Sequence, residues 1–170
     1  SLYQDLSVQE NIDFFATVFN TSFTANRSLI EDIYVQLEPF KNRPAGKLSG
    51  GMKQKLALCC ALIHEPQILF LDEPTAGLDP IGAAAFDQLI LTLRDSLGLT
   101  VFLITHDLDT LYTICDRVAV LAQKKILVAD SLEVVEKFDE PWVRDYFQGP
   151  RGRAAQQART RQTSLSSAGH

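Results

Sequence analysis

The sequence predicts an α/β fold in which helices pack on a parallel β-sheet. The first observation behind this is an apolar run at residues 68–71, which leads into Asp72 and Glu73 and is stopped by Pro74. A short apolar run bounded in this way is typical of a strand buried on both faces of a parallel sheet. The second observation is that a helical stretch and another apolar run, residues 100–105, follow at the spacing of a βαβ unit. We therefore expect two parallel strands that end at the same edge of the sheet.

Helical periodicity accounts for most of the other elements. Apolar residues recur at helical spacing before residue 40, and Pro39 ends the second of two helices there. Asp79 and Gly98 suit the two ends of a later helix, because Asp is a favoured N-cap residue and Gly adopts the left-handed C-cap conformation. In chain order we expect helices at 8–19, 29–37, 50–64 and 80–97, a short helix after His106, strands at 117–121 and 125–129, and a last helix from Ser131.

The composition is that of an ordinary globular chain. The 170 residues can bury a core, and a hydrophobic fraction of 46% with a charged fraction of 22% is typical of such proteins. The longest uninterrupted apolar run, Leu56 to Ile63, is too short to cross a bilayer, and no signal peptide opens the chain. We therefore expect a cytoplasmic protein. Its three cysteines lack metal-ligand spacing and are expected to be buried thiols.

Charge is unevenly distributed along the chain. The formal net charge is −5, yet the last twenty residues hold four arginines and no acid. We expect residues 149–170 to form a disordered basic tail, because arginine among Ser, Ala, Gln and Gly cannot build a packed core. The acidic remainder of the chain argues against a nucleic-acid partner.

The two carboxylates at the end of the first strand are one candidate site. In open α/β sheets the chemistry lies at the carboxyl ends of the strands, where Asp72 and Glu73 emerge. An aspartate that holds Mg²⁺, beside a glutamate that polarises an attacking water, would explain the pair. This is the Walker B arrangement of nucleotide hydrolases. A strand that ends in Asp-Glu can also simply cap the next helix, and that alternative stays open.

Two further features could meet a phosphate group. Ser49, Gly50 and Gly51 open a helix, where free backbone N–H groups and the helix dipole favour an anion. The alternative there is a plain serine N-cap. His106 leaves the second strand, so that its imidazole could reach a terminal phosphate or the attacking water; the alternative is a histidine satisfied at a helix start. Asp79 has a plain alternative too, as an N-cap.

In this order and spacing the motifs resemble those of the ATP-binding cassette (ABC) superfamily of transporter ATPases. Leu48 to Lys55 is similar to the signature motif, although Met52 and Lys55 stand where glutamine and arginine are commoner. Four further stretches are similar to family motifs: Walker B at Ile68 to Glu73, the D-loop at Ala76 to Asp79, the switch histidine at His106 and the segment after the Q-loop at residues 2–12. The resemblance as a whole covers residues 1–148.

The resemblance implies a fold and a function. The fold would be a partial P-loop NTPase (RecA-like) parallel sheet with helices, plus the α-helical subdomain of ABC proteins. Residues 1–66 would be the helical subdomain with the signature motif, 67–130 the later part of the RecA-like core, and 131–148 C-terminal helices. The function would be that of an ATP-binding and ATP-hydrolysing subunit that powers transport through an integral membrane permease, on the cytoplasmic face of the inner membrane.

The resemblance also gives the strand-end residues catalytic roles. Asp72 would bind Mg²⁺, Glu73 would orient the attacking water, and His106 would sense the γ-phosphate of ATP. The sequence, however, contains no Gly-x-x-x-x-Gly-Lys-Ser/Thr P-loop. We therefore expect the chain as given neither to bind ATP tightly nor to hydrolyse it alone. We hypothesise that a P-loop segment joined at its N-terminus restores a magnesium-dependent ATPase.

The signature residues would serve a neighbouring molecule. Ser49, Gly50 and Gly51 would close on the ATP of a second ABC ATPase subunit, and Asp79 would couple the two sites. A non-catalytic dimerising fragment is one alternative function. A non-transport ABC ATPase of DNA repair or translation is another, although the chain has no heptad run for the coiled coils of such proteins.

The two halves of the chain resemble different branches of the superfamily. Residues 1–75 resemble ATPases of ABC-2 type exporters, whereas residues 76–153 resemble ATPases that work with MCE-type lipid transporters. Our hypothesis is that the chain is a recombinant, assembled or designed chimera. The sequence therefore predicts no single transported substrate.

Overall fold

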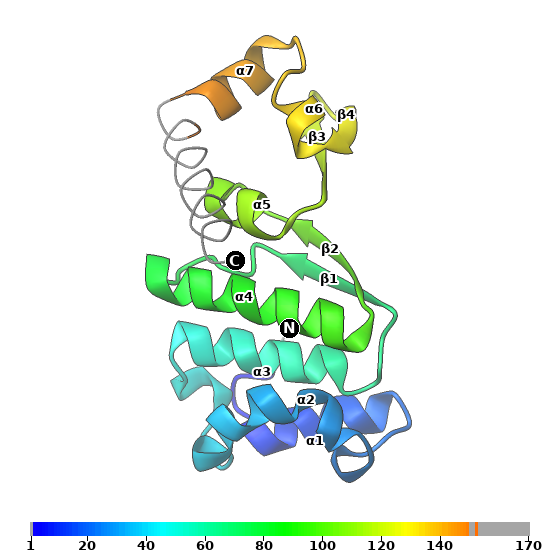
Figure 1. The fold of residues 1–170 in the computed structure, drawn as a ribbon. Coiled ribbons are helices and arrows are strands. Elements are labelled where there is room, and N and C mark those ends of the chain that lie inside the picture. Colours follow the sequence, from blue (N-terminus) through cyan, green and yellow to red (C-terminus); the bar gives the residue numbers. More distant parts are fainter. Residues whose placement is uncertain (1, 150–151, 153–170) are drawn as a thin grey trace, which may run out of the picture. The chain divides into compact units, whose positions relative to one another are not determined.

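The structure is a computed structural model that describes residues 2–149 and 152. It divides into two compact units, residues 1–104 and residues 105–170 (Figure 1). The predicted disordered tail at 149–170 lies almost entirely outside the described residues. A search of the described helices finds none with the length and apolar character needed to cross a bilayer.

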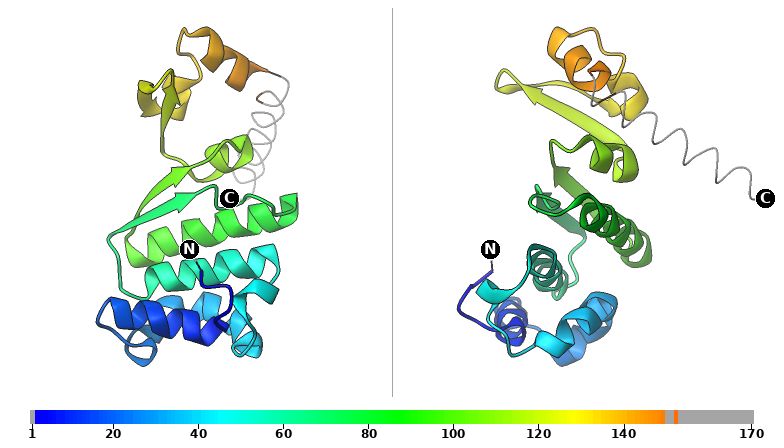
Figure 2. Two further views of the ribbon diagram at one scale, coloured as in Figure 1. Left: turned by 180° about the vertical axis from the view of Figure 1, so that it is seen from behind. Right: turned by 90° about the vertical axis from the view of Figure 1, so that its left-hand side faces the viewer.

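The first unit begins with three packed helices, which confirm the helices predicted there. They are α1 (Val8–Val18), α2 (Phe23–Leu37) and α3 (Gly50–Leu62), with the 3₁₀ turns η1 (Glu38–Phe40) and η2 (Ala45–Lys47) between the last two. Figures 1 and 2 show the three helices side by side. Fully buried aliphatic side chains fill the space between them, among them Ile12, Ile30, Ile33, Leu37 and Leu56.

Two cysteines belong to this helical core, as predicted. Cys59 and Cys60 are buried free thiols on α3. Burial disfavours the thiolate, so it raises the pKa of Cys59 and raises the pKa of Cys60 to about 12. Both thiols are therefore uncharged at neutral pH. Cys115 is only partly buried and lies in the second unit.

A buried asparagine fixes the segment that precedes α1. Asn11 is fully buried, and its Oδ1 accepts a hydrogen bond of 2.9 Å from the Tyr3 backbone N–H. Its Nδ2 donates to the backbone carbonyls of Tyr3, Leu6 and Ser7 at 2.9–3.2 Å. Buried amides need such partners. One side chain thereby holds residues 3–7 against the helix.

The second part of the first unit is a β–α–β segment. It consists of β1 (Ile68–Asp72), α4 (Pro80–Leu97) and β2 (Thr100–Ile104). The strands pair in parallel, with Asp72 opposite Ile104, so the prediction of parallel strands with a common carboxyl edge is confirmed. Asp79 caps the start of α4, and Gly98, at φ 64°, ends it in the left-handed conformation.

The prediction that the first strand is buried on both faces was wrong. Leu69 is 3% exposed, but Phe70, on the opposite face, is 70% exposed. Phe102 pairs with Phe70 and is also half exposed, with the ring centroids 5.3 Å apart. The sheet has two strands, and among the described residues nothing covers this face. Apolar character alone therefore did not establish burial.

The second unit packs three short helices on a hairpin. It consists of α5 (Leu108–Ile114), the antiparallel strands β3 (Arg117–Ala122) and β4 (Lys125–Ser131), α6 (Leu132–Val135) and α7 (Pro141–Gln148). The single last helix predicted from Ser131 is therefore two helices. The first, α6, ends at Val135, and Pro141 starts the second at its first position, capped by the side chain of Glu140.

We predict that Asn11→Ala lowers the free energy of unfolding of the first unit by about 1–3 kcal/mol, because it leaves partly buried backbone groups of residues 3–7 without partners. Urea unfolding followed by far-UV circular dichroism measures the change. The matched control is Asn42→Ala at an exposed position, which should change stability by less than about 0.5 kcal/mol. Equal effects of the two substitutions would contradict the role given to Asn11.

Candidate functional site

The carboxylate pair lies where the sequence predicts it, at the carboxyl end of β1. Asp72 is the last residue of β1 and is exposed. Glu73 follows, and its backbone N–H donates a hydrogen bond of 2.8 Å to the carbonyl of Ile104, the last residue of β2. The two strand ends are thus joined at the point where the carboxylates leave the sheet.

Glu73 has an unfavourable backbone conformation. Its φ is 45°, in the left-handed region that residues with a side chain rarely adopt. This conformation costs about 1–2 kcal/mol for an L-residue other than glycine. Such strain persists only where surrounding structure holds it, and it is concentrated at functional sites. Other described residues, such as Glu65 and Lys124, share this conformation, so at Glu73 it bears on function only together with the position beside Asp72 at the end of β1.

A pair of tight turns leads from Glu73 to the next helix. Ala76 N–H donates to the Glu73 carbonyl at 3.0 Å, and Leu78 N–H donates to the Thr75 carbonyl at 3.1 Å. Gly77 has φ 76°, which a glycine adopts without strain. The turns bring the Leu78 side chain against the start of α3, where a Cβ added at Gly50 would lie 3.6 Å from Leu78 Cδ2. The sequence did not predict this role of Leu78.

The signature residues form an exposed helix start. Ser49 is the N-cap of α3, and its hydroxyl accepts from Met52 N–H at 3.4 Å. Ser49 and Gly50 are exposed. The first N–H groups of an α-helix have no acceptor within the helix. The start of α3 therefore offers polar N–H groups and the positive end of the helix dipole to an anion.

Among residues 2–149, no neighbouring atom requires glycine at positions 50 and 51. An added Cβ at Gly50 would meet Leu78 Cδ2 at 3.6 Å and the Gly77 carbonyl at 3.7 Å, and one at Gly51 would meet Leu78 Cδ2 at 3.8 Å. These are ordinary van der Waals distances. Neither glycine has a positive φ, and glycine in a helix costs about 0.5–1 kcal/mol relative to alanine. Alanine at positions 50 and 51 would therefore be compatible with the fold.

Asp79 also acts as a helix cap. Its Oδ1 accepts from the N–H groups of Ile81 and Gly82, each at 3.0 Å. A Cβ added at Gly82 would lie 3.2 Å from Asp79 Oδ2, so a side chain there would crowd the carboxylate. Gly82 is thus part of the arrangement, although the sequence analysis did not single it out. Asp79 therefore has a structural role as a helix cap, and a coupling role across a dimer would be additional to it.

His106 belongs to the second unit and is exposed. It precedes α5, where the Asp107 side chain caps the helix by accepting from Asp109 N–H at 3.0 Å. Only Thr105 separates His106 from Ile104, which lies opposite Asp72 in the sheet. Two residues of chain span at most about 7 Å, so the covalent chain keeps the His106 backbone within that distance of Ile104.

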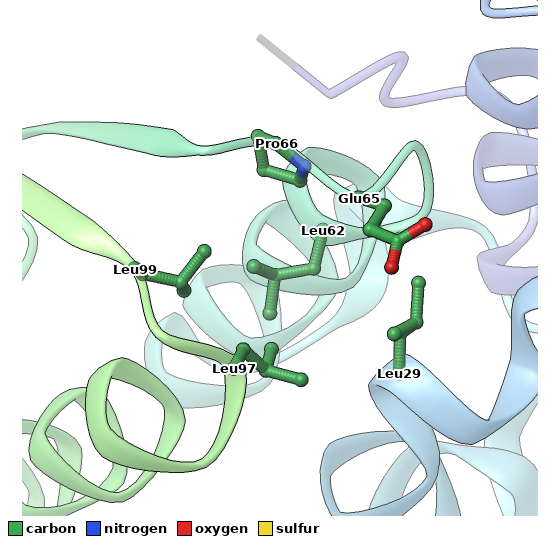
Figure 3. A pocket seen from close by; sticks show the side chains of 6 residues that line it. All are labelled: Leu29, Leu62, Glu65, Pro66, Leu97 and Leu99. Carbon is green, nitrogen blue, oxygen red and sulfur yellow. The ribbon is translucent and has the colours of Figure 1, made fainter.

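One small hollow in the first unit is unsuited to a nucleotide. Its lining comes from the middle of α2, from the last residues of α3 and α4, and from the residues that precede the two strands (Figure 3): Leu29, Leu62, Glu65, Pro66, Leu97 and Leu99. The space measures about 40 Å³. A water molecule needs about 10–15 Å³ of such space, and ligand pockets have several hundred. The hollow also lies at the opposite ends of β1 and β2 from Asp72 and Glu73.

The residues present fit a magnesium ion that takes one ligand from the protein and most of its ligands from water and a nucleotide. Mg²⁺ binds one or two protein carboxylates and completes its shell with water and phosphate oxygens. Asp72 offers one exposed carboxylate at the sheet edge. In the part of the chain that the structure describes, no group of three or more His, Cys, Asp or Glu side chains forms a complete metal site. Asp72 could therefore hold Mg²⁺ only together with oxygens of a nucleotide and water.

Known proteins resemble this chain over different parts of its length. Residues 1–76 match a family model described as ABC transporter. The methionine import ATP-binding protein MetN 1 of Listeria monocytogenes is 52% identical over 87 residues, 51% of this chain and 26% of that protein. A fluoroquinolones export ATP-binding protein of Mycobacterium tuberculosis is 39% identical over 129 residues, 76% of this chain and 42% of that protein. The chain spans less than half the length of these curated relatives.

A solved structure has the same architecture. CbiO1 from Clostridium perfringens, described as part of the ABC transporter complex cbiONQ, gives a TM-score of 0.68 at 28% identity. The match covers 93% of this chain and 62% of that one. The predicted α/β class and the predicted resemblance are thereby confirmed. The relatives are ATP-binding proteins of importers and exporters, and this chain belongs to the ABC transporter family of ATP-binding proteins.

Proposed function

We propose that this chain supplies catalytic residues for magnesium-dependent ATP hydrolysis in a membrane transporter. The observation that carries the proposal is the backbone of Glu73, which bonds to the end of β2 and follows directly after the exposed Asp72. Two adjacent carboxylates at the carboxyl edge of a parallel sheet suit a nucleotide's outer phosphates.

Each residue at this edge has a distinct role in the proposal. Asp72 would hold Mg²⁺, which would supply neutralisation of the charge on the phosphates. Glu73 accepts a hydrogen bond from the attacking water and orients it. His106 donates a hydrogen bond to the γ-phosphate, and so makes hydrolysis depend on the presence of that phosphate.

The start of α3 serves a second ABC ATPase subunit. Gly50 and Gly51 have no internal steric reason to be glycine, and Ser49 beside them is exposed. Glycine permits a ligand to approach the backbone closely. We propose that the ATP bound by the second subunit is this ligand, and that Asp79 couples the two sites across the dimer.

The complete activity requires parts beyond these residues. The sequence has no P-loop, so we propose that a P-loop segment must be joined to residues 1–104 before ATP is held and hydrolysed. The working assembly would be a dimer bound to an integral membrane permease at the cytoplasmic face. The missing P-loop also favours a second candidate, a non-catalytic dimerising fragment. Calorimetric titration with ATP separates the catalytic candidate from the non-catalytic one. A non-catalytic fragment should give no heat of ATP binding, whether the chain is titrated alone or after a P-loop segment has been joined to it.

We predict that Glu73→Gln lowers kcat for ATP hydrolysis by at least about 100-fold in a P-loop-joined form of the chain, while the Kd for ATP stays within twofold, because the amide cannot act as a base for the water. The matched control is Glu65→Gln. Glu65 has a similar left-handed backbone, φ 56°, but lies before β1, at its other end. A Glu73→Gln variant that keeps the wild-type kcat would remove Glu73 from this role.

We also predict that Gly51→Ala has opposite effects on stability and activity. The added methyl group meets only Leu78 at an ordinary distance and removes backbone freedom, so the free energy of unfolding should rise by up to about 1 kcal/mol. ATP turnover by the dimer should fall at least tenfold, because the methyl group blocks close approach of the second subunit's ATP. Urea unfolding and a coupled ATPase assay measure the two quantities. A large loss of stability would mean that the fold itself needs this glycine.

A further inference from the structure

A tyrosine of the last described helix holds the backbone of the histidine at the candidate site. The hydroxyl of Tyr146, on α7, donates a hydrogen bond of 2.8 Å to the backbone carbonyl of His106. Forty residues separate the two in sequence. Both residues belong to the second unit, so this contact depends only on the fold of that unit.

The position of Tyr146 is fixed by the core of the second unit. Its neighbours on α7, Val143 and Phe147, are 0% and 1% exposed. They belong to one hydrophobic cluster with Leu108 and Tyr112 of α5, the helix that begins just after His106. A buried side chain of this kind has one well-packed position. The hydrophobic cluster that α7 shares with α5 therefore positions the helix that carries the Tyr146 hydroxyl.

The two residues that flank His106, Thr105 and Asp107, also make hydrogen bonds. Asp107 N–H donates to the Thr105 hydroxyl at 3.0 Å, and the Asp107 carboxylate caps α5. The Tyr146 bond fixes the peptide plane between His106 and Asp107, and thereby restricts the ψ angle of His106. With these contacts in place, the direction in which the His106 side chain leaves the backbone has little freedom.

We propose that Tyr146 is a positioning residue for His106, and that α7 thereby controls how well the imidazole reaches the γ-phosphate. The inference rests on the proposed role of His106 and deepens it. Catalytic groups act within narrow limits of distance and direction, so a small displacement of the imidazole lowers the rate of the chemical step. Tyr146 itself contacts neither ATP nor water in the reaction.

The expected effect follows from the strength of one hydrogen bond. Removing a single neutral hydrogen bond costs a free energy that corresponds to about a three- to tenfold change in an equilibrium constant or a rate constant. Tyr146→Phe should therefore lower kcat by about three- to tenfold. KM for ATP should stay within twofold, because the lost hydroxyl makes no contact with the nucleotide. The aromatic contacts of residue 146 with Trp142, at 5.2 Å, and with Phe147, at 5.1 Å, stay in place.

The decisive experiment is a double-mutant cycle of Tyr146→Phe with His106→Ala, measured as ATPase activity in the P-loop-joined form. If Tyr146 acts through His106, Tyr146→Phe should have no further effect in the His106→Ala background. The matched control is Tyr112→Phe, which removes a tyrosine hydroxyl that contacts Glu136 in the same unit. This control should leave kcat within twofold of wild type and should behave alike in both backgrounds.

The outcomes separate this inference from the proposed function. If His106→Ala keeps the wild-type kcat, the proposed role of His106 fails, and this inference fails with it. If His106→Ala lowers kcat but Tyr146→Phe does not, or lowers it equally in both backgrounds, only the positioning role is overturned.

A spectroscopic test needs no ATPase activity and uses the 170-residue chain. Tyr146→Phe should shift the ring signals of His106 in NMR spectra while those of His64, in the first unit, stay unchanged. Tyr112→Phe should leave the His106 signals in place. Unchanged His106 signals in Tyr146→Phe would overturn the positioning role.

Discussion

The hydrogen bond from Glu73 N–H to the Ile104 carbonyl is the contact on which the candidate site depends. The left-handed backbone at Glu73 costs about 1–2 kcal/mol, whereas one hydrogen bond contributes about 0.5–1.5 kcal/mol. The bond is therefore comparable in size to the strain. The turn bond from Ala76 N–H to the Glu73 carbonyl and the burial of Pro74 and Thr75 also hold this turn. The backbone at residue 73, from which the carboxylate leaves, is consequently held by the sheet and the turn.

Local signals in the sequence were sufficient to predict the ends of α4 and the parallel pairing of β1 with β2. Asp79 and Gly98 begin and end α4 as predicted, because capping depends on the residue and its immediate neighbours. The same locality explains why Ser49 and Asp79 were ambiguous. A capping side chain and a ligand-binding side chain need the same residue types at the same place, and the structure shows both residues as caps. The distinguishing observation is the room around Gly50 and Gly51, which requires coordinates.

Features that depend on distant parts of the chain could not be predicted. Phe70 lies in an apolar strand, and its exposure depends on what covers that face of the sheet, which periodicity does not reveal. The contact between Tyr146 and His106 joins residues forty positions apart, and nothing in either local sequence indicates it. The left-handed backbone of Glu73 follows from the end of β2 and has no signal at residue 73 itself. The chimera hypothesis and the assignment of domains at 1–66, 67–130 and 131–148 stay predictions.

The short segment from Ile104 to His106 links the two held positions of the site. The carbonyl of Ile104 accepts from Glu73, the carbonyl of His106 accepts from Tyr146, and only Thr105 lies between them. A segment of two residues spans at most about 7 Å, so the covalent chain keeps the His106 backbone near the end of β2. Within the second unit, the backbone at His106 depends on the hydrogen bond from Tyr146 and thus on the position of α7. A substitution or ligand that displaced α7 within that unit would therefore act on His106 without contacting its imidazole.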